Sequence, residues 1–319
     1  MSMLILSADV GATNCRLGLW RGDELIDQAT PFTAAEPPDA AARRFTAGRP
    51  LAAACLAVAG PVVNGVAELT NAGWTIAEDE VAAALGCPAL IVNDFVGAAR
   101  GVTALGPDGF THLHGPAPQR GLIGVLGAGT GLGQALLSPV GESDWQVWPS
   151  QGGHVDLAPT DDESLELLRF FMERHPEHVS AERALSGEGL LALQAFYRSR
   201  GLAGGTLTDP AQVSASGDDA SRAAIRRFCQ LLGAAAGNLG VSLLPKGGIY
   251  LAGGLPPRFD LVGLGLVEAF LAKGRMRPLL MDVPLRLVTD PLLGLRGAAL
   301  LAAERSLAPQ HLRRPEPRL

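Results

Sequence analysis

The stretch GLIGVLGAGTGLGQALL, residues 121–137, carries the pattern that decides the fold of this chain. An apolar run leads into GAGTGLG (127–133), which holds four glycines and one threonine, and a second apolar run follows. Glycine allows positive φ and lets backbone N–H groups approach a ligand closely. The pattern therefore predicts a strand, a glycine-rich turn suited to holding phosphate, and a second strand.

The same pattern occurs earlier, in LILSADVGATNCRLGLW (4–20). An apolar run there ends in DVGATN (9–14), and the alternating segment CRLGLW (15–20) follows. Two such turns, one in each half, predict a duplicated α/β fold that holds phosphate between its halves. Two ordinary β-hairpins are the alternative interpretation, because glycine is the usual hairpin residue.

The turn at 127–133 differs from the common nucleotide-binding motifs. It lacks the GK[ST] of a Walker A loop, and the only lysines, Lys246 and Lys273, lie far away in the sequence. The following QALLSP (134–139) predicts a strand where a dinucleotide-binding GxGxxG would lead into a helix. A dinucleotide oxidoreductase is therefore a weaker fit.

Hydrophobic periodicity predicts a mixed α/β chain. Outside the two glycine patterns, strands are expected at 24–32, 51–61, 66–70, 247–252 and 283–290, and residues 89–102 pass from strand to helix. Helices are expected at 180–201, with a break at Ser186-Gly187, and at 221–244 and 292–306. Another begins near Thr160, which has capping-box spacing with Glu163. The tail, 308–319, is expected to be loosely ordered.

Composition excludes several classes of function. The 319 residues are 47% hydrophobic and 18% charged, so a substantial core can form. The net charge is −6 and no long run of Lys or Arg occurs, which argues against nucleic-acid and anionic-membrane partners. Cys15, Cys55, Cys87 and Cys229 lack metal-site spacing and fit a reducing compartment. With neither a signal peptide nor a transmembrane span recognisable, a cytoplasmic protein is expected.

Several polar residues next to strand ends or glycines could carry chemistry. Asp9 could hold a hydrated Mg²⁺ or cap its turn. Asp94 could act as a general base or as a helix N-cap. Polar side chains around Gly-Gly in WPSQGGHVDL (148–157), together with Glu182, suit hydrogen bonds to a polyol; an interior histidine and a surface charge are the alternatives.

Taken together, these stretches resemble the bacterial glucokinase family of the hexokinase/actin-like ATPase superfamily. The motifs run in order from about residue 4 to 305: DVGATN, AGPV…LTNAGW, IVNDF, GAGTGLG, GGHVDLAP, SAERALSG, LAGGLPPR and GLLGLRGAA. The resemblance implies two ribonuclease-H-like α/β domains with an interdomain cleft, a small one of 1–104 plus 289–319 and a large one of 105–288. It also implies ATP-dependent phosphorylation of glucose at O6 with Mg²⁺, and a homodimer.

The resemblance also assigns residues to roles. It implies that phosphate is contacted by Gly11, Ala12, Thr13, Gly129, Thr130 and Gly131, and the adenosine side by Gly253 and Gly254. It implies that Asp9 faces Mg²⁺ through water. It implies that the sugar is bound by Asn71, Asn93, Asp94, Gln151, His154 and Glu182, and that Asp94 accepts the O6 proton as general base.

Two positions depart from the family pattern. Ala12 stands where the family usually has glycine, so its turn must be one that alanine can adopt. Gln151 stands where the family usually has Glu, which keeps an acceptor oxygen but loses the charge. Because hydrogen bonds to charged groups are stronger, glucose binding could be weaker by roughly tenfold.

Other functions remain open on the sequence. One is a kinase for another hexose, such as mannose or an amino sugar, or for another phosphoryl donor, such as polyphosphate. The related ROK group carries a cysteine-rich zinc motif, whereas HVDLAPTDDES (154–164) has no Cys. A non-catalytic sugar-sensing protein is a further alternative, for which an N-terminal DNA-binding motif would be expected, and none is recognisable before Met3.

Overall fold

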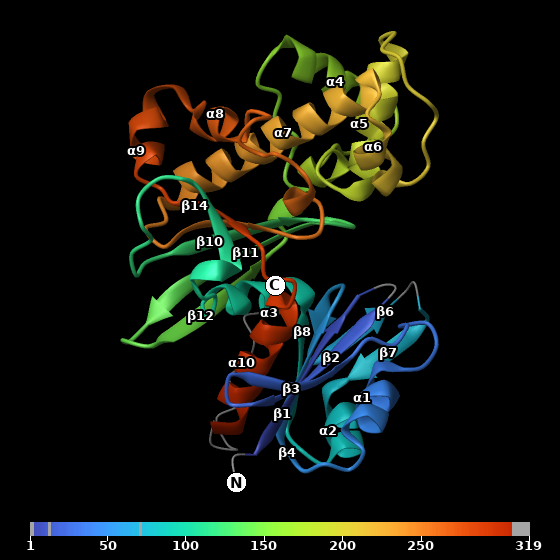
Figure 1. Cartoon of the computed structure of the whole chain (residues 1–319), viewed down its shortest axis with the longest axis vertical. Coiled ribbons are helices and arrows are strands. Elements are labelled where there is room, and N and C mark those ends of the chain that lie inside the picture. Colours follow the sequence, from blue (N-terminus) through green and yellow to red (C-terminus); the bar gives the residue numbers. More distant parts are fainter. Residues whose placement is uncertain (1–2, 12–13, 70–71, 308–319) are drawn as a thin grey trace. The chain divides into compact units, whose positions relative to one another are not determined.

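The computed structural model describes residues 3–11, 14–69 and 72–307 (Figure 1). The chain divides into two compact units, which are described separately: Met1–Leu105 with Asp290–Leu319, and Gly106–Thr289. Both units combine sheets with helices, so the predicted mixed α/β class is confirmed.

The first unit is built on a five-stranded sheet in the order β3-β2-β1-β4-β8. Its strands are β1 (Leu4–Val10), β2 (Cys15–Arg21), β3 (Glu24–Ala29), β4 (Leu51–Val58) and β8 (Ala89–Asn93). β1 pairs antiparallel with β2 and parallel with β4, whose continuous apolar run is buried almost throughout. A small second sheet contains β5 (Val62–Val63), β6 (Val66–Leu69) and β7 (Trp74–Ala77).

Helices cover both faces of the large sheet. α1 (Pro38–Thr46) and α2 (Glu78–Leu85) pack on the face that contains Leu6, and α10 (Leu293–Leu307) packs on the face that contains Ile5. α3 (Asp94–Val102) runs beside α10 at close range (Figure 1). A Cβ at Gly297 of α10 would lie only 1.7 Å from the carbonyl oxygen of Gly97 in α3, so glycine is required at this crossing.

The second unit contains a six-stranded sheet in the order β12-β11-β10-β13-β14-β9. Its strands are β9 (Phe110–His114), β10 (Ile123–Ala128), β11 (Leu132–Val140), β12 (Asp144–Ser150), β13 (Gly248–Ala252) and β14 (Leu285–Val288). β10 pairs antiparallel with β11 and parallel with β13, which is the arrangement of β1 with β2 and β4. The glycine-rich turns therefore lie at equivalent positions of the two sheets.

The main core of this unit lies between the sheet and its helices. The helices are α4 (Asp162–Met172), α5 (Gly187–Ser199), α6 (Pro210–Ser216), α7 (Asp219–Leu243), α8 (Leu266–Leu271) and α9 (Arg277–Met281). The 25-residue helix α7 contributes Phe228 and Leu232, both fully buried. No helix within the described ranges is long and apolar enough to cross a membrane.

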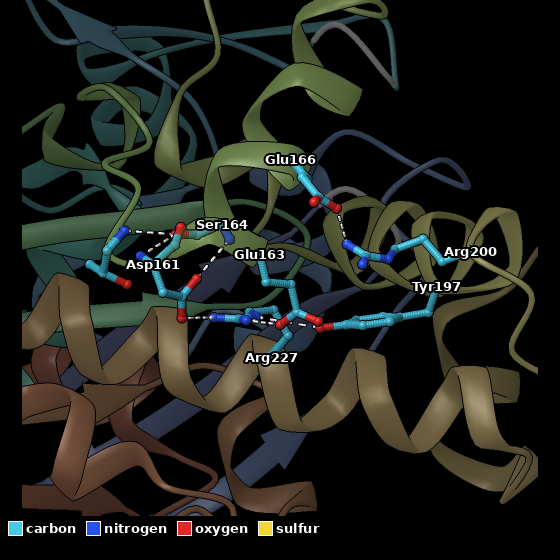
Figure 2. Close-up of polar contacts among 8 residues, drawn as sticks. Asp161, Glu163, Ser164, Glu166, Tyr197, Arg200 and Arg227 are labelled. Atoms are coloured by element: carbon cyan, nitrogen blue, oxygen red, sulfur yellow. Dashed lines mark hydrogen bonds and ion pairs between the residues drawn. The ribbon is translucent and has the colours of Figure 1, made fainter.

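The predicted cap of α4 was wrong. Asp161, not Thr160, is the N-cap of the helix: its carboxylate accepts from Ser164 N at 2.7 Å, and Ser164 Oγ accepts from Asp161 N at 2.8 Å (Figure 2). With Asp161 as the N-cap, Ser164 occupies the third helical position and completes the capping box, and the Glu163 carboxylate forms an ion pair with Arg227 of α7. Arg227 also donates to Asp161 Oδ2 at 3.0 Å and to Tyr197 Oη at 3.4 Å. One buried guanidinium thus joins α4, α5 and α7.

Candidate functional site

The site residues of the first unit begin with Asp9 near the end of β1. Arg16 of β2 lies 3.7 Å from its carboxylate, and a Cβ at Gly294, in the first turn of α10, would lie 3.1 Å from it. Burial, opposed by the nearby Arg16 charge, raises the pKa of Asp9. A further cation near this carboxylate would lower its pKa again, because a positive charge stabilises the ionised form.

Asn93 and Asp94 lie at the junction between β8 and α3. Asn93 is the N-cap of α3, and its Oδ1 accepts from Phe95 N at 3.0 Å. Its Nδ2 donates to the carbonyl oxygen of Gly60 at 2.9 Å. The alternative in which Asp94 is the N-cap is therefore wrong, because Asn93 occupies that position. Asp94 is the first residue of the helix, and Asn93 fixes the backbone that carries it.

The carboxyl group of Asp94 has a raised pKa. Burial, together with the negative charge of Asp9, raises the pKa of Asp94 to about 6. The hydrogen bond from Phe95 N, 2.9 Å from Oδ1, opposes this rise without cancelling it. A general base works best when its pKa is near the working pH, so this carboxylate can accept a proton from a hydroxyl group at neutral pH.

The first glycine turn is closed by its own backbone. Gly11 N donates to Asn14 O at 3.0 Å, and Thr33 Oγ1 donates to Gly11 O at 2.8 Å. The amide of Gly11 is thus already used inside the turn. Ala12, Thr13 and Asn71 lie outside the described residues, so their predicted contacts with phosphate and sugar stay predictions.

The second glycine turn is fixed at several points within its unit. Gly129 N donates to Gly131 O at 2.9 Å, and Gly129 O accepts from Gly187 N, at the beginning of α5, at 2.9 Å. Thr130 lies exposed between the two glycines. This turn is therefore anchored while the hydroxyl-bearing residue at its centre faces solvent.

Gly253 is packed against the same turn. Its φ is +91°, and a Cβ there would lie 2.2 Å from the carbonyl oxygen of Ala128. Only glycine satisfies both conditions. A Cβ at Gly129 would in turn lie 3.9 Å from Gly254 N. The structure therefore brings the predicted phosphate turn and the predicted adenosine turn together.

The Gly-Gly-His segment packs on the strand that follows the phosphate turn. Gly152 approaches so closely that a Cβ would lie 2.3 Å from the Gln134 amide, and a Cβ at Gly153 would lie 1.8 Å from Leu132 O. The short 3₁₀ turn Gly152–His154 is thus pressed against β11, with both Gln151 and His154 exposed. The two flanking side chains are available for a ligand.

Glu182 completes this group. Its Oε2 accepts from Leu132 N at 2.8 Å, and its Oε1 lies 3.8 Å from His154 Nδ1. Gln151, His154 and Glu182 therefore come from segments that meet at the beginning of β11. The surface-charge alternative for Glu182 is wrong, because its side chain is only 28% exposed and bonded to the backbone.

Sequence reasoning missed three residues that shape the site. Arg16 lies beside Asp9, Gly60 anchors Asn93, and the backbone N–H of Leu132 anchors Glu182. The proximity of Arg16 follows from its pairing opposite Asp9 across the first hairpin. The other two are backbone contacts between distant segments, which residue types alone do not signal.

The comparisons with known proteins settle the family. A family model described as Glucokinase matches residues 6–305. The chain belongs to the glucokinase family. A glucokinase of Trichormus variabilis is 38% identical over 284 residues, which cover 78% of this chain and 81% of that protein. As a glucokinase-family member, the chain is an enzyme.

Solved structures agree with this family assignment. The crystal structure of a glucokinase from an Antarctic psychrotroph is 32% identical, with a TM-score of 0.84, and covers 95% of this chain and 100% of that one. A glucokinase of Balamuthia mandrillaris, solved in complex with glucose, is 24% identical with a TM-score of 0.80 and covers 94% of each chain. At that identity the second likeness shows the glucokinase fold alone.

Proposed function

We propose that this glucokinase-family chain transfers the γ-phosphoryl group of ATP to O6 of D-glucose, giving ADP and glucose 6-phosphate. The observation that carries the proposal is the Asp94 carboxyl, whose pKa is raised to about 6 at the junction of a strand and a helix. Membership of the glucokinase family supports both substrates.

In this reaction Asp94 accepts the proton of the O6 hydroxyl. O6 forms a bond to the γ-phosphorus while the bond between that phosphorus and the oxygen of the leaving ADP breaks. Asn93 keeps the carboxylate directed by holding the first turn of α3. Gln151, His154 and Glu182 orient the sugar through hydrogen bonds, and such positioning supplies much of the rate in phosphoryl transfer.

Phosphate binding is assigned to the glycine turns. Gly129, Thr130 and Gly131 hold the terminal phosphates, and Gly253 and Gly254 contact the adenosine side. We also propose that Gly11, Ala12 and Thr13 of the first unit contact phosphate. Neither unit alone contains both the base and the anchored glycine turn, so we propose that domains 1–104 plus 289–319 and 105–288 form an interdomain cleft. Closure of that cleft would exclude water, a competing nucleophile.

A magnesium ion fits the first unit through Asp9. Within the described ranges, no group of three His, Cys, Asp or Glu side chains could hold a metal. Mg²⁺ in nucleotide sites needs only one or two carboxylates, because water and phosphate oxygens complete its shell. The half-buried Asp9, whose pKa is raised, would hold the ion through water. When bound, the ion would neutralise charge on the transferring phosphate.

Two broader properties belong to the same proposal. The four cysteines are free and buried, which supports a reducing, cytoplasmic location. We also propose a homodimer, which size-exclusion chromatography with light scattering would test.

A coupled assay of ADP release with a panel of hexoses tests the function. Glucose is expected to give the highest kcat/KM with ATP, and omission of Mg²⁺ is expected to abolish turnover. Mannose, amino sugars and polyphosphate as donor also belong in the panel, because the sequence leaves a kinase for another hexose or donor open. A higher kcat/KM for one of these would identify another hexose or donor, and no turnover at all would favour a sugar-sensing protein.

A further inference from the structure

Two segments that carry proposed sugar ligands contact the backbone of Leu132, one at its N–H and the other at its carbonyl oxygen. The N–H of Leu132 donates to Glu182 Oε2 at 2.8 Å. Its carbonyl oxygen lies against Gly153, where a Cβ would be only 1.8 Å away, and Gly153 directly precedes His154. Leu132 is also the residue that follows the phosphate turn. The backbone at this position therefore touches both parts of the proposed site.

Gly131 fits closely against the same carboxylate. A Cβ at Gly131 would lie 2.6 Å from Glu182 Oε2, whereas a Cβ at Gly129 would meet only Gly254 N, at 3.9 Å. A side chain at Gly131 would therefore require the Glu182 carboxylate to move away from the turn. The position of the carboxylate and the path of the turn depend on each other.

The carboxylate of Glu182 has two distinct sides. Oε2 faces Leu132 N, and Oε1 lies 3.8 Å from His154 Nδ1. The segment that contains Glu182 is hydrogen-bonded to the segment that follows His154: Ala181 N donates to Val155 O at 2.8 Å, and Leu157 N donates to Val179 O at 2.9 Å. One oxygen is thus committed to the phosphate turn, and the other remains on the side of the proposed sugar.

We propose that Glu182 is a positioning residue for the phosphate turn in addition to being a sugar ligand, so that sugar bound at Oε1 stabilises the turn through Leu132. The inference rests on the proposed function for the identity of the sugar. Coupling between two ligands is reciprocal, so glucose should tighten nucleotide binding by the same factor by which nucleotide tightens glucose binding.

The test measures the affinity for ADP with Mg²⁺ by isothermal titration calorimetry, with and without saturating glucose. In Glu182→Ala, ADP without sugar is expected to bind about tenfold more weakly, because a hydrogen bond to a charged group is lost. In the same variant, the ratio of ADP affinity with glucose to ADP affinity without glucose should fall to about one. Glu182→Gln keeps an acceptor for Leu132 N and should stay within about threefold of the wild type for ADP alone.

His154→Ala is the matched control. It removes the proposed sugar ligand beside Glu182 Oε1 and leaves the bond between Oε2 and Leu132 N in place, so ADP affinity without sugar should change by less than about twofold. Glu182→Ala with wild-type ADP affinity and an undiminished glucose effect would overturn the inference and leave the proposed function standing. A wild type that phosphorylates no glucose would overturn the proposed function, while weak ADP binding by Glu182→Ala alone would still support the positioning role.

Gly131→Ala tests the same contact if Glu182→Ala does not fold. Its methyl group would displace the carboxylate from the side of the turn, so glucose KM should rise by about threefold or more. Gly129→Ala adds the same methyl group to the same turn without approaching Glu182, and should raise glucose KM less. Equal effects of the two substitutions on glucose KM would contradict the inference.

Discussion

The Asn93 side chain donates from Nδ2 to the carbonyl oxygen of Gly60 at 2.9 Å and so joins the end of β8 to the segment that follows β4. Its Oδ1 caps α3 at the same time, through Phe95 N. The residue before the proposed base is therefore a structural anchor, whatever it also contributes to sugar binding.

Asn93→Ala removes both contacts and is expected to lower the free energy of unfolding by about 1–2 kcal/mol, measured by urea denaturation. Asn93→Asp keeps the cap acceptor, loses the donor to Gly60 and adds a negative charge beside Asp94. Its stability should lie between those of the wild type and Asn93→Ala. If Asn93→Asp is as stable as the wild type, the bond to Gly60 contributes nothing.

Asp94→Ala is expected to lower kcat by at least about 10²-fold, because it removes the proposed general base. ADP should still bind, since the substitution leaves the glycine turns intact. In the wild type, kcat/KM for glucose should fall as the pH drops below about 6, where Asp94 becomes protonated. Near-normal kcat in Asp94→Ala would remove this residue from the base role.

Asp94 also makes stability depend on pH in a defined direction. Its pKa is raised from 3.8 to about 6 in the folded protein, so the folded state binds the proton more tightly. The resulting stabilisation of the folded state is fully present below pH 3.8 and is lost as the pH rises through about 6. Asp94→Asn cannot ionise, so its Tm should exceed that of the wild type more at about pH 8 than at about pH 4, without Mg²⁺. A Tm difference independent of pH would argue against the raised pKa.

Gln151→Glu is expected to lower glucose KM by up to about tenfold with little change in kcat, because a charged acceptor replaces a neutral one. Gln146→Glu introduces the same charge on β12, where Gln146 Nε2 donates to Val147 O at 3.0 Å, outside the proposed site. It should leave glucose KM unchanged. An unchanged KM in Gln151→Glu would mean that residue 151 does not contact the sugar.

Arg227→Met should lower the free energy of unfolding by about 1–3 kcal/mol, because Asp161 and Glu163 lose their ion pairs with the guanidinium. The loss is limited to this range because both carboxylates are exposed enough to be hydrated. Although burial opposes it, hydrogen bonds from Ser164 and Arg227 hold the pKa of Asp161 below its usual value of 3.8. That contribution is present above 3.8 and is lost as the pH falls through the lower folded value. The deficit of Arg227→Met should therefore shrink in acid.

Arg200→Met is the control for Arg227→Met (Figure 2). Arg200 also forms an ion pair, with Glu166, but its side chain is 41% exposed, against 7% for Arg227. The loss should stay within about 0.5 kcal/mol. Equal losses in the two variants would mean that burial of Arg227 adds nothing to stability.

The sequence predicted the elements that are buried and apolar. β1, β4, β10 and β13 appear as continuous apolar runs, and α7 has helical periodicity. Sequence reasoning did not assign α1 and α2, whose short Ala-, Glu- and Pro-rich sequences give little apolar signal. It also missed β9 and β12, because edge strands such as DWQVWPS need not be apolar.

Parts of the candidate site were also predictable. A carboxylate at the end of a strand and glycines between strands were recognised from residue type and order. The anchoring contacts of Asn93 with Gly60 and of Glu182 with Leu132 were not, because each uses a backbone group of a distant segment. Such contacts depend on three-dimensional proximity and have no residue signature.

The packing of α10 has a consequence for synthesis on the ribosome. Leu295, Ala298 and Ala302 of this last helix share a buried cluster with Ile5 and Ala53, close to the beginning of the chain. All of Gly106–Thr289 is translated before α10, so the inserted unit can complete its core first. The nascent chain must meanwhile carry one apolar face of its first sheet uncovered. Translation pauses or chaperone binding after Thr289 would therefore act on the N-terminal third of the protein.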